Sequence, residues 1–155
     1  MLIVLIIINP LKQISRARDT DRKNTLRQIQ RALEEYSVLN GRYPATLVDF
    51  DLYDLSQYTT NGFLQALYDI GSLKAPIKDP AQTTPDRQCV PGHTNWDNCF
   101  AFAYSSIPGP FGVGPNDYVL FVQLENADDS MIQTHSCANY RSDLTHPCVF
   151  LKPNN

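Results

Sequence analysis

The sequence lacks the short motifs that mark many enzymes and binding proteins. It contains no G-x-S-x-G, H-E-x-x-H or Walker-type loop, no C-x-x-C pair and no N-x-S/T acceptor for glycosylation. It also lacks a basic excess, because 13 Lys and Arg residues stand against 16 Asp and Glu residues, a net charge of −3. This composition argues against a strongly basic nucleic-acid-binding protein. We therefore expect neither catalysis nor a cofactor.

Long apolar runs are absent as well. The one unbroken run, residues 1–8 (MLIVLIII), is far shorter than the roughly 20 apolar residues that span a bilayer. It has no basic residues before it and no small-residue cleavage site after it, so it does not fit a secretory signal peptide. We expect it to be the tail of a longer apolar helix whose start is missing from the sequence.

The length of 155 residues suits one domain. Apolar residues recur with helical spacing across residues 11–39, and they place one apolar face on the second half of a predicted helix: Leu26, Ile29, Leu33 and Tyr36. Asn40 and Gly41 favour a stop, and Pro44 forbids continuation. The sequence therefore predicts one long N-terminal helix.

The first half of this helix is polar on all sides. Residues 15–25 (SRARDTDRKNT) contain Ala17 as their only apolar residue. Such a helix must project into solvent or be covered by partners. We therefore expect a protruding helix segment over residues 1–25, with an apolar tip and a charged shaft, and a globular head over residues 26–155 that includes the second half of the helix.

The remainder of the chain is rich in turns, in keeping with its 11 Pro and seven Gly residues. Apolar spacing predicts a second helix that starts near residue 63 and stops at Gly71. Strands are predicted over residues 99–105, 118–124 and 148–151. A long helix followed by a small antiparallel sheet defines an α+β fold.

Charge is distributed unevenly along the chain. Residues 1–45 hold eight basic and four acidic residues, a net charge of +4, whereas residues 46–155 hold five and twelve, a net charge of −7. Opposite charges of this kind attract between copies, although an ordinary solvated helix face would look the same. Because no internal partner is evident, we predict that four helix residues pair with acidic head residues of other copies: Arg16, Arg18, Arg22 and Lys23.

Four cysteines lie in the second half of the chain: Cys89, Cys99, Cys137 and Cys148. An even number in Pro-rich loops favours disulfides and an oxidising compartment. We predict the neighbour pairings Cys89–Cys99 and Cys137–Cys148, with a cross pairing such as Cys89–Cys148 as the alternative. A zinc site that adds His93 and His146 is the rival interpretation, but the spacing of ligands typical of zinc is absent.

An acidic loop offers a second possible metal site. Residues 126–130 (NADDS), with Asp117 as a further oxygen donor, have the ligand type that calcium prefers. The D-x-D-x-D-G pattern of a helical calcium loop is absent, so a solvated turn is the favoured interpretation. We therefore predict no metal.

The N-terminal region resembles that of a known family. Residues 3–22 (IVLIIINPLKQISRARDTDR) resemble the N-terminal helix of type IV pilins and pseudopilins, and residues 26–44 (LRQIQRALEEY through NGRYP) continue the resemblance. More loosely, the D-P at residues 79–80 and the stretches 100–104 and 118–126 are similar to the sheet-forming part of the family. The prepilin cleavage site and the early Glu of the family have no counterpart here, which again suggests a missing upstream half.

This resemblance implies a structural subunit of an extracellular filament. Pilin-like subunits are held in the inner membrane before the pilus assembly machinery packs their apolar helices into a filament of identical subunits, with the heads outward. The resemblance and the apolar run together assign ten residues to the filament core: Leu2, Ile3, Val4, Leu5, Ile6, Ile7, Ile8, Pro10, Leu11 and Ile14. The expected roles are adhesion, motility or DNA uptake.

Two other functions fit the same sequence. One is a pseudopilin of a type II secretion or competence system. The other is an extracellular binding module that is tethered by its helix and uses its Pro- and Gly-rich loops to bind a surface, a sugar or DNA. Ordered helical fibres built from this chain would separate a filament subunit from a tethered module.

Overall fold

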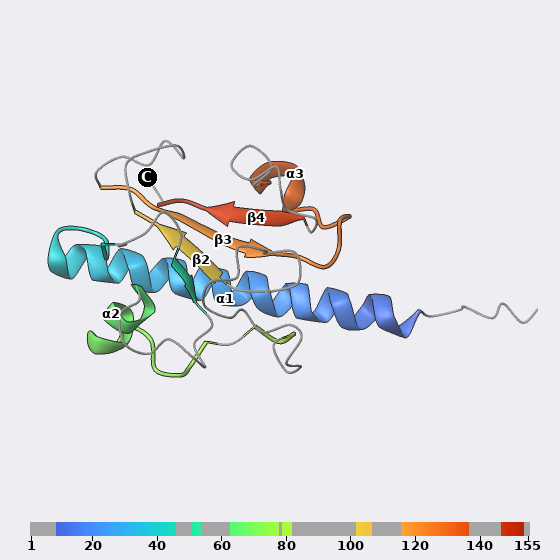
Figure 1. The fold of residues 1–155 in the computed structure, drawn as a ribbon, viewed down its shortest axis with the longest axis horizontal. Helices are drawn as coiled ribbons and strands as arrows, with labels where there is room; N and C mark the ends of the chain where they lie inside the picture. The colour runs from blue at the N-terminus through green and yellow to red at the C-terminus, as the bar shows by residue number, and fades with distance from the viewer. Residues whose placement is uncertain are drawn as a thin grey trace, which may run out of the picture.

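A computed structural model describes residues 9–45, 51–53, 63–77, 79–81, 102–106, 116–136 and 147–153, with only the backbone of residues 51–53. Its elements follow the order α1 (Pro10–Asn40), β1 (Asp51–Tyr53), α2 (Phe63–Asp69), β2 (Phe102–Ser105), β3 (Val119–Gln123), α3 (Ile132–His135) and β4 (Cys148–Leu151). The fold is α+β, as predicted: a long N-terminal helix packs on a small antiparallel sheet (Figure 1).

Both ends of α1 have identifiable causes. At its start, Oδ1 of Asn9 accepts hydrogen bonds from the backbone N–H groups of Leu11 and Lys12, and Pro10 occupies the first helical turn. At its end, Gly41 adopts the left-handed conformation with φ 69°, and its N–H donates to the carbonyl of Ser37 at 2.8 Å. The 31 residues between these caps make a helix about 46 Å long.

Over the described residues, the sheet has four antiparallel strands in the order β1-β2-β3-β4. The prediction for residues 148–151 is confirmed, and β2 and β3 lie within the ranges predicted for them. β1 and α3 are not predicted by the sequence pattern. These elements have three and four residues, which is too short for an apolar period to be recognised.

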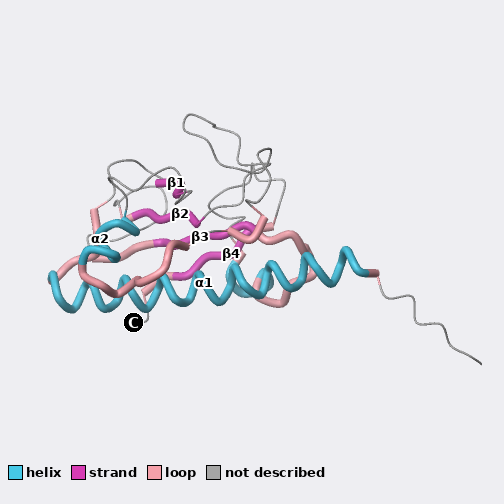
Figure 2. Tube along the Cα trace, turned by 90° about the horizontal axis from the view of Figure 1, so that it is seen from below, coloured by secondary structure: helices cyan, strands magenta, loops and turns pink. Residues whose placement is uncertain are grey.

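The core lies between α1, α2 and the sheet (Figure 2). The predicted apolar face of α1 is buried there, since Leu26, Ile29 and Leu33 have no exposed surface. Aromatic rings from two elements join it: Phe63 of α2 stacks on Tyr104 of β2 with ring centroids 4.4 Å apart. The second half of α1 is therefore held by ordinary apolar packing.

The carboxylate of Glu34, on this half of the helix, also binds two tyrosines that follow it in the chain. The two oxygens of Glu34 accept hydrogen bonds from the hydroxyls of Tyr43, at 2.9 Å, and Tyr118, at 3.0 Å. Burial, aided by the hydrogen bond to Glu34, raises the pKa of Tyr43 to about 12. Burial and the nearby Glu34 charge also raise the pKa of Tyr118. The turn after α1 is thereby fixed to the helix and to the start of β3.

Candidate assembly site on helix α1

The polar half of α1 contains a buried group of charges. Arg22 has no exposed surface, and Asp19, one turn earlier, is 1% exposed. Arg22 forms a two-pronged pair with Asp79, in which Nε donates at 2.7 Å and Nη2 at 2.9 Å. Its Nη1 donates to Asp19 at 2.8 Å and lies 2.9 Å from Oε1 of Glu125. The guanidinium is therefore surrounded by three carboxylates.

These carboxylates also bind the backbone of two other segments. Asp19 accepts the N–H groups of Glu125 and Asn126, both at 2.9 Å. Asp79 accepts the N–H of Ala81 at 2.8 Å. The helix, the segment 79–81 and the chain after β3 are thus joined by one network, which we name the Arg22 network: Arg18, Asp19, Arg22, Asp79 and Glu125.

Two more basic residues of α1 find partners in the same region. Arg18 binds both carboxylate oxygens of Glu125, and Lys23 lies 2.5 Å from Asp129. Burial alone would raise the pKa of Glu125, but hydrogen bonds from Arg18 and Arg22 outweigh it and lower that pKa. The pKa of Asp129 is lowered in the same way, because the hydrogen bond from Lys23 outweighs its burial. Both groups are therefore held as carboxylates at neutral pH.

This arrangement corrects the charge prediction. Arg18, Arg22 and Lys23 were expected to lack partners in their own chain, yet all three form ion pairs with head residues. Of the four predicted residues, Arg16 alone is exposed and forms no ion pair with the described part of the chain. The N-terminal half of α1 is therefore held against the head by ion pairs. Apolar spacing in the sequence does not reveal contacts of this kind.

The head consequently holds more of the helix than predicted. The predicted boundary lies at residue 25, but the contacts continue past it to Ser15, whose hydroxyl donates to Oδ1 of Asn126 at 3.3 Å, and to Lys12, whose ammonium group lies 3.6 Å from Asp128. The roles of Asp19, Asp79 and Glu125 are not predicted by the sequence pattern. The available signal was the spacing of Asp19 and Arg22, which is the spacing of an ion pair on one helix face.

The first two turns of α1 differ from the rest of the helix. Leu11 is 75% exposed and Ile14 is 50% exposed, and Pro10 is exposed beside them. In Figure 1 this end of α1 extends past the strands of the sheet. The other predicted core residues lie outside the described residues: Leu2, Ile3, Val4, Leu5, Ile6, Ile7 and Ile8. The part of the predicted tip that is described is therefore uncovered by its own head.

The acidic loop after β3 contacts the helix. Asp129 pairs with Lys23 and accepts the N–H of Met131 at 3.0 Å, while Asp128 lies 3.6 Å from the ammonium group of Lys12. Over the described residues, no group of three or more His, Cys, Asp or Glu side chains is placed to hold a metal ion. The described carboxylates of this loop thus neutralise lysines of α1.

The cysteine predictions fall mostly outside the described residues, where Cys89, Cys99 and Cys137 lie together with His93 and His146. Cys148, the first residue of β4, is disulfide-bonded. Its pairing with Cys137 stays a prediction.

In the segments that the structure describes, no helix has an apolar stretch of the length required to cross a bilayer. None of the protein-family models, curated proteins or solved structures with which the chain was compared matches it.

Proposed function

We propose that this chain is the structural subunit of an extracellular, type IV pilus-like filament, which it forms with identical copies through the apolar N-terminal end of α1. The observation that carries the proposal is the exposure of Leu11 and Ile14 on helical turns that extend past the sheet. In the sequence, these turns directly follow the apolar run of residues 1–8. An apolar helix end of this kind favours burial against apolar partners.

Contact between copies would supply that burial. Each square ångström of apolar surface removed from water contributes about 25 cal/mol, so Leu11 and Ile14 add to the larger contribution expected from residues 1–8. A membrane takes the same apolar end before assembly, and pilus assembly machinery transfers it to the filament. The heads then face outward, where they support adhesion, motility or DNA uptake.

The Arg22 network supports this function in a second way. A filament subunit must transmit load between its helix and its head without separating the two. Asp79 and Glu125 bind the helix on the N-terminal side of its buried apolar residues, at Arg22 and Arg18. The network therefore fixes the direction in which the apolar end projects.

The proposal is tested by placing a charge on the exposed apolar end. We expect Leu11→Asp and Ile14→Asp to abolish filaments seen by electron microscopy, because an unpaired carboxylate in an apolar contact costs several kcal/mol. The heads should fold normally, since both side chains lie outside the core. Val38→Asp is the matched control: Val38 is 83% exposed at the other end of the same helix, and this variant should assemble.

Two results would contradict the proposal. Normal filaments from both N-terminal variants would show that this end does not lie in a contact between copies. No filaments from the unaltered chain, expressed with pilus assembly machinery, would instead favour the tethered binding module.

A further inference from the structure

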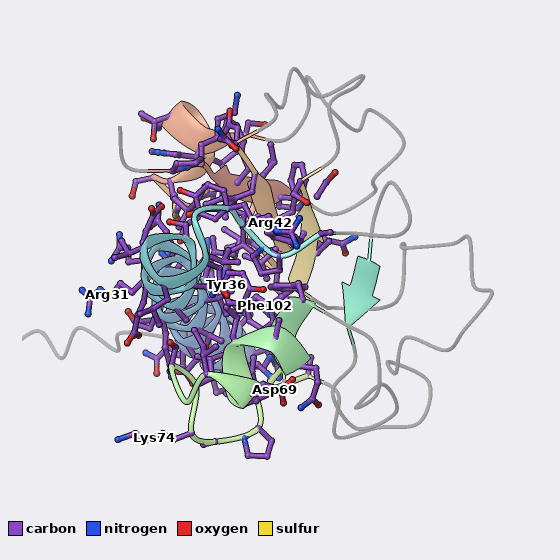
Figure 3. The ribbon with its side chains drawn as sticks, turned by 90° about the vertical axis from the view of Figure 1, so that its left-hand side faces the viewer. Arg31, Tyr36, Arg42, Asp69, Lys74 and Phe102 are labelled. Atoms are coloured by element: carbon purple, nitrogen blue, oxygen red, sulfur yellow. The ribbon has the colours of Figure 1, made fainter. Side chains whose placement is uncertain are left out.

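A hollow of about 450 Å³ lies on the outer side of α1, against the turn that follows α2. Its lining is mostly polar: Asn24, Arg27, Gln28, Arg31, Glu35 and Ser72. Figure 3 shows Arg31 on the side of the helix that faces away from the sheet. The hollow is therefore on the face of α1 that its own head leaves open.

The hollow contains charged and polar groups that have no partner among the described residues. Arg27 and Arg31 form no ion pair with the parts of the chain that the structure describes. The two arginines lie one helical turn apart, so their positive charges are neighbours. Like charges at this spacing repel each other and destabilise a helix. The hydroxyl of Ser72 is buried and makes no hydrogen bond within the same segments. A carboxylate placed in the hollow would be attracted by both guanidinium groups.

We propose that the hollow binds a carboxylate side chain on the head of a second copy of this chain. This inference rests on the proposed filament function and names one of its contacts. It replaces Arg18, Arg22 and Lys23, which are occupied within their own chain, by Arg27 and Arg31 as the basic partners between copies. Arginine suits the role because its planar group binds carboxylates through two parallel hydrogen bonds.

Charge complementarity identifies the occupant. Residues 46–155 carry a net charge of −7, and three of their carboxylates are used by their own helix: Asp79, Glu125 and Asp129. A fourth carboxylate, Asp128, also pairs with the helix through the half-exposed Lys12, but its side chain is 81% exposed and remains accessible to a second copy. The second copy therefore presents an exposed carboxylate to a hollow that holds two arginines and one carboxylate, Glu35.

Position along the helix argues against a lipid phosphate as the occupant. Arg27 lies 16 residues beyond Leu11, which is about 24 Å along the helix axis. With the apolar end in a bilayer, Arg27 and Arg31 stand clear of the headgroups. A contact with a neighbouring head remains within reach of both.

Photocrosslinking tests the contact directly. Benzoylphenylalanine at Gln28, an exposed residue of the hollow, should join two copies in filaments, and the joined peptide should carry an Asp or Glu within two residues. The double variant Arg27→Glu, Arg31→Glu should lower the yield of this product about tenfold or more, because it sets carboxylate against carboxylate. The matched control Arg42→Glu makes the same charge change at an exposed residue outside the hollow and should leave the yield unchanged.

The outcomes separate this inference from the filament proposal. Filaments in which Gln28 gives no product between copies, or in which the double variant gives an unchanged yield, would overturn the hollow contact and leave the filament standing. Joined copies without filaments would support the contact and contradict the filament. Neither filaments nor joined copies would overturn both. Circular dichroism of the double variant verifies that its head is folded.

Discussion

Arg22 carries its charge at a position with no exposed surface, and this requires nearly complete pairing. Burial opposes the charged form, but the hydrogen bonds that Arg22 donates to Asp79, Asp19 and Glu125 outweigh it and raise the pKa of Arg22. The planar guanidinium fits this site because its nitrogens reach several carboxylates at once. The cost of desolvation is therefore offset only while the whole group is present.

We expect Arg22→Met to destabilise the head by about 3–5 kcal/mol, because it leaves Asp79 and Asp19 buried without their cation. Urea unfolding followed by circular dichroism measures the change. Arg22→Lys should give an intermediate loss, since an ammonium group cannot reproduce the two-pronged pair with Asp79.

The matched control is Arg16→Met on the exposed side of the same helix, which should change the free energy of unfolding by about 0.5 kcal/mol or less. Equal effects of Arg16→Met and Arg22→Met would contradict the importance of the Arg22 network.

At the scale of elements, the end of α1 depends on a left-handed residue. Gly41 has φ 69°, and apart from its two neighbours in the chain no residue has an atom within 4 Å of the place that a Cβ would occupy. The cost of a side chain there is therefore that of the backbone conformation alone. The same turn leads to Tyr43, whose hydroxyl binds Glu34, so the conformation of Gly41 sets where the chain rejoins the head.

We expect Gly41→Ala to lower the free energy of unfolding by about 1–2 kcal/mol, because L-residues with a Cβ disfavour this conformation. Gly41→Asn is the control and should lose less, since Asn visits the left-handed region more readily. Thermal unfolding of the three proteins measures both effects. An Asn variant that loses more stability than the Ala variant would show that space, and not backbone conformation, limits this turn.

The sequence was sufficient for the elements whose signal is local. Helical spacing and the Asn40-Gly41 stop predict α1, and an apolar run predicts β4. The Arg22 network could not be derived in this way, because Arg22 and Asp79 are 57 residues apart and Arg18 and Glu125 are 107 apart. Sequence spacing shows which helix residues are charged, but only the fold shows which carboxylates reach them.

At the scale of the whole molecule, β4 is an outer strand of the sheet that pairs with β3 on one side. Its first residue, Cys148, is disulfide-bonded, so this edge is also held covalently. Gln30 of α1 adds a third connection by donating to the carbonyl of Lys152 at 2.7 Å. The C-terminal segment is thereby attached to the sheet, to the helix and to a second cysteine.

We expect peptide mapping without reductant to recover a peptide that joins Cys137 to Cys148, and another that joins Cys89 to Cys99. Removing the first bridge by the double change Cys137→Ser, Cys148→Ser should destabilise the head by about 2–4 kcal/mol, because it releases a restraint on the unfolded chain. A recovered peptide that joins Cys89 to Cys148 would contradict the pairing.

The contacts between the head and α1 have a mechanical consequence. Ser15, Arg22 and Glu34 bind the head at successive positions along one continuous helix. A pull on the N-terminus along the helix axis would therefore load these contacts together, in shear, and would not peel them apart one after another. Of these three, the contact nearest to the point where tension enters is the hydrogen bond of Ser15, and the charge pairs around Arg22 follow about two turns further along the helix, so the molecule resists stretching near the junction where its helix leaves the head.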